Sequence, residues 1–303
     1  MKQPIIMALC LGLMGACGDG NPFFVDPADE AGDADPTAGT SSVYGTALNA
    51  ALTMNALDYD DQGTADPTDD ILLVNNLPFD NSDVSDGGYT RIGVLSTSPF
   101  DLYESPTSGG PGDRKYFAVF QRTTYAQVAA VATDDYVDFG FGGASAQRVG
   151  PSGTPASRAA LYTFTGDYAA VAVVRPDAGG GTLRYITGDA TVFVDLEDFD
   201  TNAAVEGIID NRQYFDDTGA PLGPLSGYIE LGIASIDFEN DLTLASTATS
   251  VDAAVTIGSG QWSSVFAGPN GEEIAGIVVI EGTMPVTGDP VRETGVFIVT
   301  NTE

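Results

Sequence analysis

The chain has 303 residues, enough for one large domain or two small ones, and 43 Asp and Glu stand against 11 Lys and Arg. It contains no histidine, which excludes a Ser-His-Asp or Cys-His relay, a histidine metal ligand and a histidine-based pH switch. Because contacts to phosphates need clustered Lys and Arg, the formal net charge of −32 also argues against nucleic acid as a partner.

Residues 1–17 have the pattern of a secretory signal peptide. Their apolar run, residues 5–14, is too short to span a membrane, and two small residues follow it. Residues 13–17 read LMGAC and resemble a bacterial lipobox, although the lipobox prefers Leu where Met14 stands. The resemblance implies cleavage before Cys17 and a lipid on that residue. Cys10 falls in the discarded segment, so we expect a mature chain without a disulfide.

Residues 18–42 are rich in Asp, Pro, Gly and small side chains and show no hydrophobic periodicity. This composition predicts a disordered tether. About 25 residues of flexible chain reach roughly 25–30 Å, which holds a folded body clear of a membrane surface.

Residues 43–157 contain short apolar runs separated by Pro, Gly, Asn and Asp, a pattern that predicts a small, irregular antiparallel β-domain. The Ala-rich residues 125–133 allow a strand or one short helix, and the neighbouring runs favour the strand. The predicted strands are residues 71–74, 89–95, 100–103, 116–121, 127–132 and 136–141.

Residues 158–303 carry longer apolar segments rich in Val, Ile, Thr, Phe and Tyr, with turn residues between them. Within residues 227–238, Ile229, Leu231 and Ile233 fall on one face, the period of two that marks a half-buried strand. Eight such strands without an intervening helix favour closure into an antiparallel barrel. The segments are residues 168–175, 183–196, 204–211, 227–238, 242–249, 254–266, 273–282 and 292–300.

A membrane-spanning barrel is the alternative, since its strands alternate in the same way. Acidic residues such as Asp195, Glu230, Asp237 and Glu281 are scattered over both faces of the predicted strands, and a lipid-facing band tolerates few charges. The lipid on Cys17 would already supply an anchor. We therefore predict a water-soluble, eight-stranded barrel.

The C-terminal segment resembles a known family. Residues 261–276 read QWSSVFAGPNGEEIAG and are followed at 293–297 by ETGVF, which is similar to the final hairpin of transferrin-binding protein B barrels. Residues 188–195 and 205–211 also resemble strands of that family. The resemblance covers residues 159–303 and implies a surface or solute-binding lipoprotein with one barrel preceded by a smaller "handle" β-domain. The turn motif that carries it comprises Gly268, Pro269, Asn270, Gly271, Glu272 and Glu273.

The turn has a physical role of its own. Pro269 fixes φ near −65°, Asn270 and Gly271 tolerate positive φ, and a following carboxylate can accept backbone N–H groups. Glu272 and Glu273 are adjacent on a strand, so they should point to opposite faces and could not act together on one bond. We therefore interpret the motif as structural, with Gly271 replacing the Ala usual in the family.

An acidic loop at residues 58–70 is a weaker candidate site. Dense carboxylates around a glycine could supply the six to eight oxygens that Ca²⁺ takes, but the spacing does not fit an EF-hand. The alternative is a solvated acidic loop without a metal. The residues concerned are Asp58, Asp60, Asp66, Asp69 and Asp70.

Two classes of function remain open at this point. The favoured one is a lipid-anchored binding protein of the bacterial outer membrane, whose barrel presents loops to a protein or a small solute. The cell surface is favoured over the periplasmic face of that membrane as its location. The alternatives are a glycoside hydrolase that uses carboxylates and a purely structural envelope lipoprotein. No pair of carboxylates stands out as catalytic, and the sequence indicates no cofactor. Transferrin binding is not carried over, because a two-lobed receptor has two handle–barrel pairs and this chain has at most one.

Overall fold

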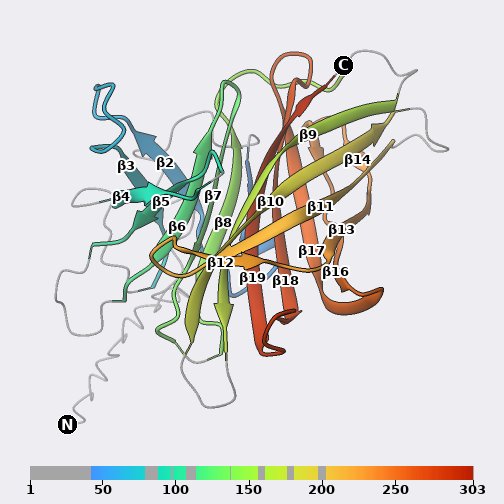
Figure 1. Ribbon diagram of the computed structural model, residues 1–303. Helices are drawn as coiled ribbons and strands as arrows, with labels where there is room; N and C mark the ends of the chain where they lie inside the picture. Colours follow the sequence, from blue (N-terminus) through green and yellow to red (C-terminus); the bar gives the residue numbers. More distant parts are fainter. Residues whose placement is uncertain are drawn as a thin grey trace, which may run out of the picture.

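The computed structural model describes residues 42–78, 88–96, 98–106, 114–136, 138–155, 161–175, 181–196 and 203–302. Two antiparallel β-sheets lie side by side in it (Figure 1). Cys17, the rest of the predicted signal peptide and nearly all of the predicted tether lie outside the described residues. Within the described ranges, no helix has the length and apolar character needed to cross a membrane.

The N-terminal sheet, here called the handle sheet, has eight short strands in the order β1-β8-β7-β6-β5-β4-β3-β2. The all-β prediction for this segment is confirmed, and the Ala-rich run forms strand β7 with every residue buried. The predicted strand at 136–141 is wrong, because its described residues form bends and turns and strand β8 begins only at Gly142. The strands are β1 (Ser42–Tyr44), β2 (Ala56–Asp60), β3 (Ile71–Asn75), β4 (Tyr89–Val94), β5 (Asp101–Glu104), β6 (Phe117–Arg122), β7 (Ala126–Ala132) and β8 (Gly142–Arg148).

The C-terminal sheet closes on itself. Its long strands pair in the cyclic order β9-β10-β11-β13-β16-β17-β18-β19, and β19 pairs with β9 to complete the ring. Each of the eight predicted segments corresponds to one of these strands, so the eight-stranded antiparallel barrel is confirmed. The long strands are β9 (Leu161–Val174), β10 (Thr182–Asp195), β11 (Ala204–Phe215), β13 (Tyr228–Ala234), β16 (Ser246–Asp252), β17 (Val255–Ala267), β18 (Glu273–Thr283) and β19 (Pro290–Asn301); the short ones are β12 (Pro221–Pro224), β14 (Ile236–Asp237) and β15 (Leu242–Thr243).

Apolar side chains fill the barrel. Ala170, Ile186, Ile209 and other inward residues of all eight strands form one buried cluster. Within it, the rings of Trp262 and Phe297 lie 6.5 Å apart between centroids. An eight-stranded barrel is just wide enough for its own side chains to fill the interior, and that is the case here.

The outer wall of the barrel is also buried where the handle sheet covers it. Ala169, Val171 and Val173 of β9 alternate with the inward residues and pack, with Ile277 and Val296, against β6, β7 and β8. This double burial explains why β18 and β19 have long runs of consecutive buried residues instead of an alternating pattern. A third cluster, which includes Met54, Tyr103 and Phe120, covers the other face of the handle sheet.

Candidate functional site

The family turn motif lies between β17 and β18. Gly268 and Gly271 take positive φ, 87° and 64°, whereas Asn270 does not. The backbone N–H of Asn270 donates to Glu272 Oε2 at 2.9 Å, and its side-chain Nδ2 donates to Oε1 at 2.8 Å. These hydrogen bonds lower the pKa of the exposed Glu272 carboxyl group. Glu272 therefore stabilises the turn itself.

The same motif joins the barrel to the handle sheet. Gly268 donates its N–H to the carbonyl of Pro151 at 2.8 Å, in the segment that connects β8 to β9. Glu273 is buried and accepts a hydrogen bond from Thr123 Oγ1, in the β6–β7 turn, at 2.5 Å. Glu272 and Glu273 thus have separate partners, and the structure gives them no shared position from which to act on one bond.

The five carboxylates of the acidic loop have hydrogen-bond partners close by in the chain. Asp58, Asp60 and Asp66 accept backbone N–H groups within two residues, and Asp69 accepts from Thr64 Oγ1 at 2.9 Å. Asp70 is buried and accepts from the hydroxyl of Tyr59 at 2.5 Å. Among the described residues, no group of three or more His, Cys, Asp or Glu side chains is placed to hold a metal ion. Calcium binding by this loop stays a prediction.

A different site lies in the barrel wall, where a β-bulge reverses the direction of one charged side chain. Thr187 of β10 pairs with Gln213, but Asp189 pairs with Asp210, so Gly188 faces two residues of β11, Asn211 and Arg212. Asn211 has a φ of 49°. The extra residue shifts the alternation, and Arg212 points inward where an undisturbed strand would turn it to solvent.

Arg212 is almost fully buried, with 2% of its surface exposed. Its Nη2 forms an ion pair with Glu293 Oε2, and the hydroxyl of Tyr168 donates to Glu293 Oε1 at 2.7 Å. Burial, followed by the neighbouring Glu293 carboxylate, raises the pKa of Tyr168 well above its ordinary value, so the phenol stays protonated. Glu293 therefore has a partner at each oxygen.

The other nitrogens of this guanidinium are not satisfied. Nε and Nη1 of Arg212 are buried and have no hydrogen-bond partner in the described part of the chain. Burying a polar group without a partner costs about 1–3 kcal/mol, and more for a charged one. A ligand or an ordered water usually satisfies a buried polar group that the protein itself leaves unpaired.

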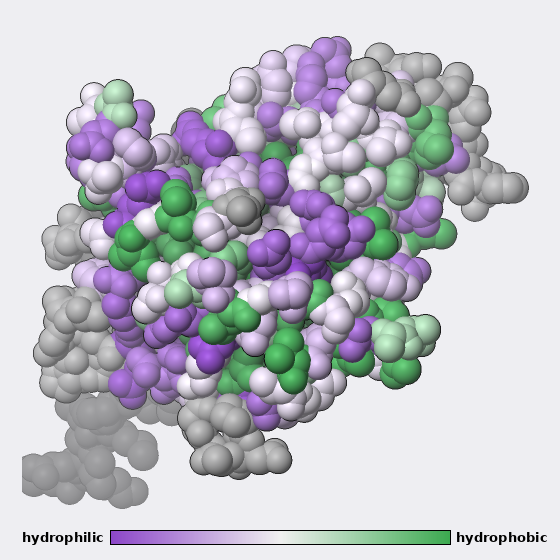
Figure 2. Space-filling model, viewed as in Figure 1, coloured by the Kyte–Doolittle hydropathy of each residue, from purple (hydrophilic) through white to green (hydrophobic). Residues whose placement is uncertain are grey.

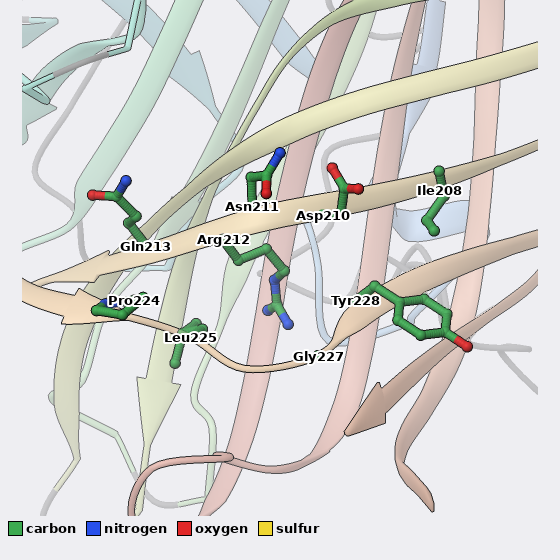
Figure 3. Close-up of a pocket in the computed structure, with 9 residues that line it drawn as sticks. All are labelled: Ile208, Asp210, Asn211, Arg212, Gln213, Pro224, Leu225, Gly227 and Tyr228. Carbon is green, nitrogen blue, oxygen red and sulfur yellow. The ribbon is translucent and has the colours of Figure 1, made fainter. Parts of the chain in front are cut away.

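A groove of about 660 Å³ opens directly at Arg212. It exists because β11 pairs with β13 only as far as Ile209 and Ile229, and with β12 from Gln213 onward. Between these pairings the chain turns outward through Gly227, whose φ is 83°. Figure 3 shows the guanidinium directed into the space between β11 and this turn. The lining residues are Ile208, Asp210, Asn211, Arg212, Gln213, Pro224, Leu225, Gly227 and Tyr228.

A much smaller cavity, of about 10 Å³, also reaches the same arginine, near the turn from β18 to β19. Arg212 and Glu293 line it together with Ser250, Ile280 and Met284. Arg212 therefore lines both cavities, and of the two only the groove has room for a ligand. Pockets that bind small molecules commonly measure 300–1,000 Å³, so the groove has the right size.

No protein-family model matches the sequence, and no curated protein matches it. Solved structures similar in fold include a variant of the vaccine antigen transferrin binding protein B from Haemophilus parasuis, with 16% identity and a TM-score of 0.39; the match covers 71% of this chain and 39% of that one. A variant of the same antigen from Actinobacillus pleuropneumoniae has 14% identity and a TM-score of 0.34, covering 71% and 98% of the two chains.

A surface lipoprotein is also similar in fold, with 13% identity and a TM-score of 0.34, covering 69% of this chain and 83% of that one. The chain spans only about two fifths of the length of the Haemophilus parasuis protein. In fold, the chain resembles transferrin binding protein B, the family that the turn motif at residues 268–273 indicates.

Proposed function

We propose that the chain is a lipid-anchored binding protein of the bacterial cell envelope, and that the groove at Arg212 is where it recognises its ligand. The observation that carries this proposal is a buried arginine with two unpartnered nitrogens at the floor of a groove of about 660 Å³. The barrel interior is already filled by apolar side chains, which favours recognition at the outer surface. We assign no catalytic role to Glu272 and Glu273, whose carboxylates hold the β17–β18 turn and the handle sheet.

The anchor is proposed from the lipobox-like residues 13–17. In cells fed with a palmitate analogue, the full chain should incorporate the label, and Cys17→Ser should abolish incorporation and release the protein from the membrane fraction. Cys10→Ser is the matched control, because it changes a cysteine of the same signal segment and should leave labelling intact. Equal labelling of both variants would remove the anchor from the proposal.

The location is proposed to be the outer face of the outer membrane. A protease added to intact cells should then digest the folded body while a periplasmic marker protein stays whole. Protection of the body until the outer membrane is permeabilised would place the protein on the periplasmic side.

Ligand binding can be tested without knowing the ligand. A molecule that binds only the folded state raises the unfolding temperature by mass action. We expect one or more fractions of an envelope extract to raise the unfolding temperature of the full chain, and Tyr228→Ala, at the rim of the groove, to reduce that rise. If no fraction raises it, or if Tyr228→Ala changes nothing, the groove is not the recognition site.

A further inference from the structure

We propose that the groove at Arg212 binds an uncharged saccharide, an inference that rests on the binding function proposed above. The first argument is charge. Glu293 neutralises Arg212, and Asp210 adds a negative charge to the lining. The groove therefore has no excess positive charge to attract an anion, although an arginine forms its floor.

The second argument is the geometry of the free donors. An arginine grips a carboxylate or a phosphate through two parallel N–H groups along one edge of the guanidinium. Both such edges include Nη2, and Glu293 already takes one of its two N–H groups, so at most one edge is left for an anion. Nε and Nη1 lie on different sides and must donate to two separate oxygens. A sugar ring, with several hydroxyl and ether oxygens at fixed spacings, offers such acceptors.

The third argument is the lining. Tyr228 has 37% of its surface exposed and lies at the Ile208 end of the groove, and Pro224 and Leu225 lie at the other side of Arg212 (Figure 3). Such apolar and aromatic surface suits the C–H face of a sugar ring, while Asp210 can accept from its hydroxyl groups. Figure 2 shows hydrophilic side chains gathered over the middle of the face that β10 and β11 cross in Figure 1.

The alternative occupant is an extended peptide that fills the interrupted ladder between β11 and β13. A peptide would be held mainly by main-chain hydrogen bonds along a strand edge. The interruption here is short, since Leu225 already donates its N–H to the carbonyl of Arg212 at 2.8 Å, three residues beyond the last β11–β13 pair. The gap therefore has room for a compact ligand, but it offers too short a strand edge for main-chain pairing with an extended peptide.

The test is a binding titration of the full chain, kept in a detergent without a sugar headgroup. The probes are glucose, galactose, mannose, N-acetylglucosamine and their β-1,4-linked disaccharides, with glucuronate and glucose 6-phosphate as charged counterparts. We expect saturable binding of at least one neutral sugar, and binding of its charged counterpart at least tenfold weaker.

Two rim variants connect this binding to the groove. Tyr228→Ala and Gln213→Ala change exposed side chains that line it, and each should weaken sugar binding about tenfold or more. Leu244→Ala is the matched control, because Leu244 is 52% exposed and lies outside the lining. Arg212→Lys keeps the positive charge, removes the separate donors and should abolish binding if it folds; the rim variants keep the proposal testable if it does not.

The outcomes separate this inference from the proposed function. Binding of a neutral sugar that the rim variants weaken supports both. If envelope fractions raise the unfolding temperature but no neutral sugar binds, the saccharide inference is wrong and the binding function stands. Tighter binding of a short extended peptide, or equal binding of the charged sugars, would also overturn the saccharide. If neither sugars nor envelope fractions bind, the arginine holds ordered water only, and both proposals fail.

Discussion

Gly271, in the turn between β17 and β18, combines a left-handed backbone with a crowded position. Its φ is 64°, and an added Cβ would lie 2.8 Å from Pro155 Cδ and 2.9 Å from the carbonyl oxygen of Gly153. The sequence interpretation of Gly271 as a small residue in place of Ala is therefore incomplete, because this turn also presses against the segment that leads from β8 into the barrel.

The expected consequence is that Gly271→Ala destabilises the protein. A non-glycine residue in the left-handed region costs about 1–2 kcal/mol, and the close contacts add to that. Gly63→Ala is the matched control, since Gly63 has a φ of 66° with no atom within 4 Å of the added Cβ. Urea denaturation should show a larger loss for Gly271→Ala. Equal losses would mean that residues 153–155 move away from the added Cβ without lowering the free energy of unfolding.

The buried pair of Arg212 and Glu293 gives a second prediction. Arg212→Met leaves the Glu293 carboxylate buried without its cation, which should cost about 3–5 kcal/mol. Adding Glu293→Gln removes that charge and retains an acceptor for the hydroxyl of Tyr168, so the double variant should be more stable than Arg212→Met alone. A double-mutant cycle by urea denaturation measures this coupling, and additive losses would contradict it.

Sequence patterns could not predict Arg212 as a site residue. Alternation assigns inward and outward residues correctly only while the register is continuous, and the bulge opposite Gly188 breaks it. An added Cβ on Gly188 would lie 2.8 Å from the carbonyl oxygen of Asp210, so its lack of a side chain lets the bulge form. The glycine is visible in the sequence, but a glycine within a strand equally often marks a barrel bend or a close backbone approach.

Among the elements, the long barrel strands were predictable, whereas β1, β2 and β8 of the handle sheet were not. Long runs of Val, Ile and Thr mark the barrel strands, because both faces of several of them are buried. Strand β8 reads GGASAQR and contains no large apolar residue. It is buried because small side chains let neighbours approach; an added Cβ on Gly143 would lie 2.2 Å from Met54 Cβ.

The aromatic residues just before β8 misled the prediction in the opposite direction. Tyr136 and Phe141 suggest a strand, but their rings pack edge to face, with centroids 5.3 Å apart, across a turn. Strand β2, which reads ALDYD, is acidic and exposed at alternate positions. Its hydrophobic signal therefore rests on two or three side chains, too few to distinguish an edge strand from the adjoining acidic loop.

The contact between the β6–β7 turn and β18 gives a prediction about these elements. Thr123→Val removes the hydroxyl that donates to the buried Glu273 carboxylate and should destabilise the protein by about 1–3 kcal/mol. Thr123→Ser keeps the hydroxyl and serves as the control. Thermal unfolding should rank the wild type and Thr123→Ser above Thr123→Val. Equal stability of Val and Ser variants would show that the hydrogen bond does not contribute.

For the whole molecule, the dominant feature is its negative charge. With a net charge of −32, carboxylates on the folded chain repel one another. Folding also brings some of them close together or removes them from water. Burial raises the pKa of Asp134, although the N–H of Leu183 donates to it at 3.2 Å, and burial with the nearby Asp189 raises the pKa of Asp167. Hydrogen bonds from Thr218 and Asn240 instead lower the pKa values of Asp216 and Asp237.

These shifts predict a stability maximum on the acidic side of neutrality. Where the folded pKa is raised, as for Asp134, the native state binds protons more tightly, so stability increases as pH falls through the folded pKa toward the ordinary Asp value of about 3.9. Where it is lowered, as for Asp216, stability is lost as pH falls through the folded pKa, below the ordinary Asp value of about 3.9. The unfolding temperature should therefore increase between pH 7 and about 5 and decrease below about 4.

Added salt and the substitution Asp134→Asn separate two causes of the increase in unfolding temperature on acidification: general repulsion between carboxylates and the burial of Asp134. Added salt screens the general repulsion between exposed carboxylates and should reduce the increase, whereas the penalty for burying Asp134 is screened much less. Asp134→Asn removes that partly buried charge and keeps an oxygen that can accept from Leu183. It should raise the unfolding temperature at pH 7 and leave a smaller gain on acidification. Glu206→Gln makes the same change of charge at an exposed position of β11 and should have a smaller effect at high salt. If the two variants behave alike at high salt, long-range repulsion alone sets the pH dependence.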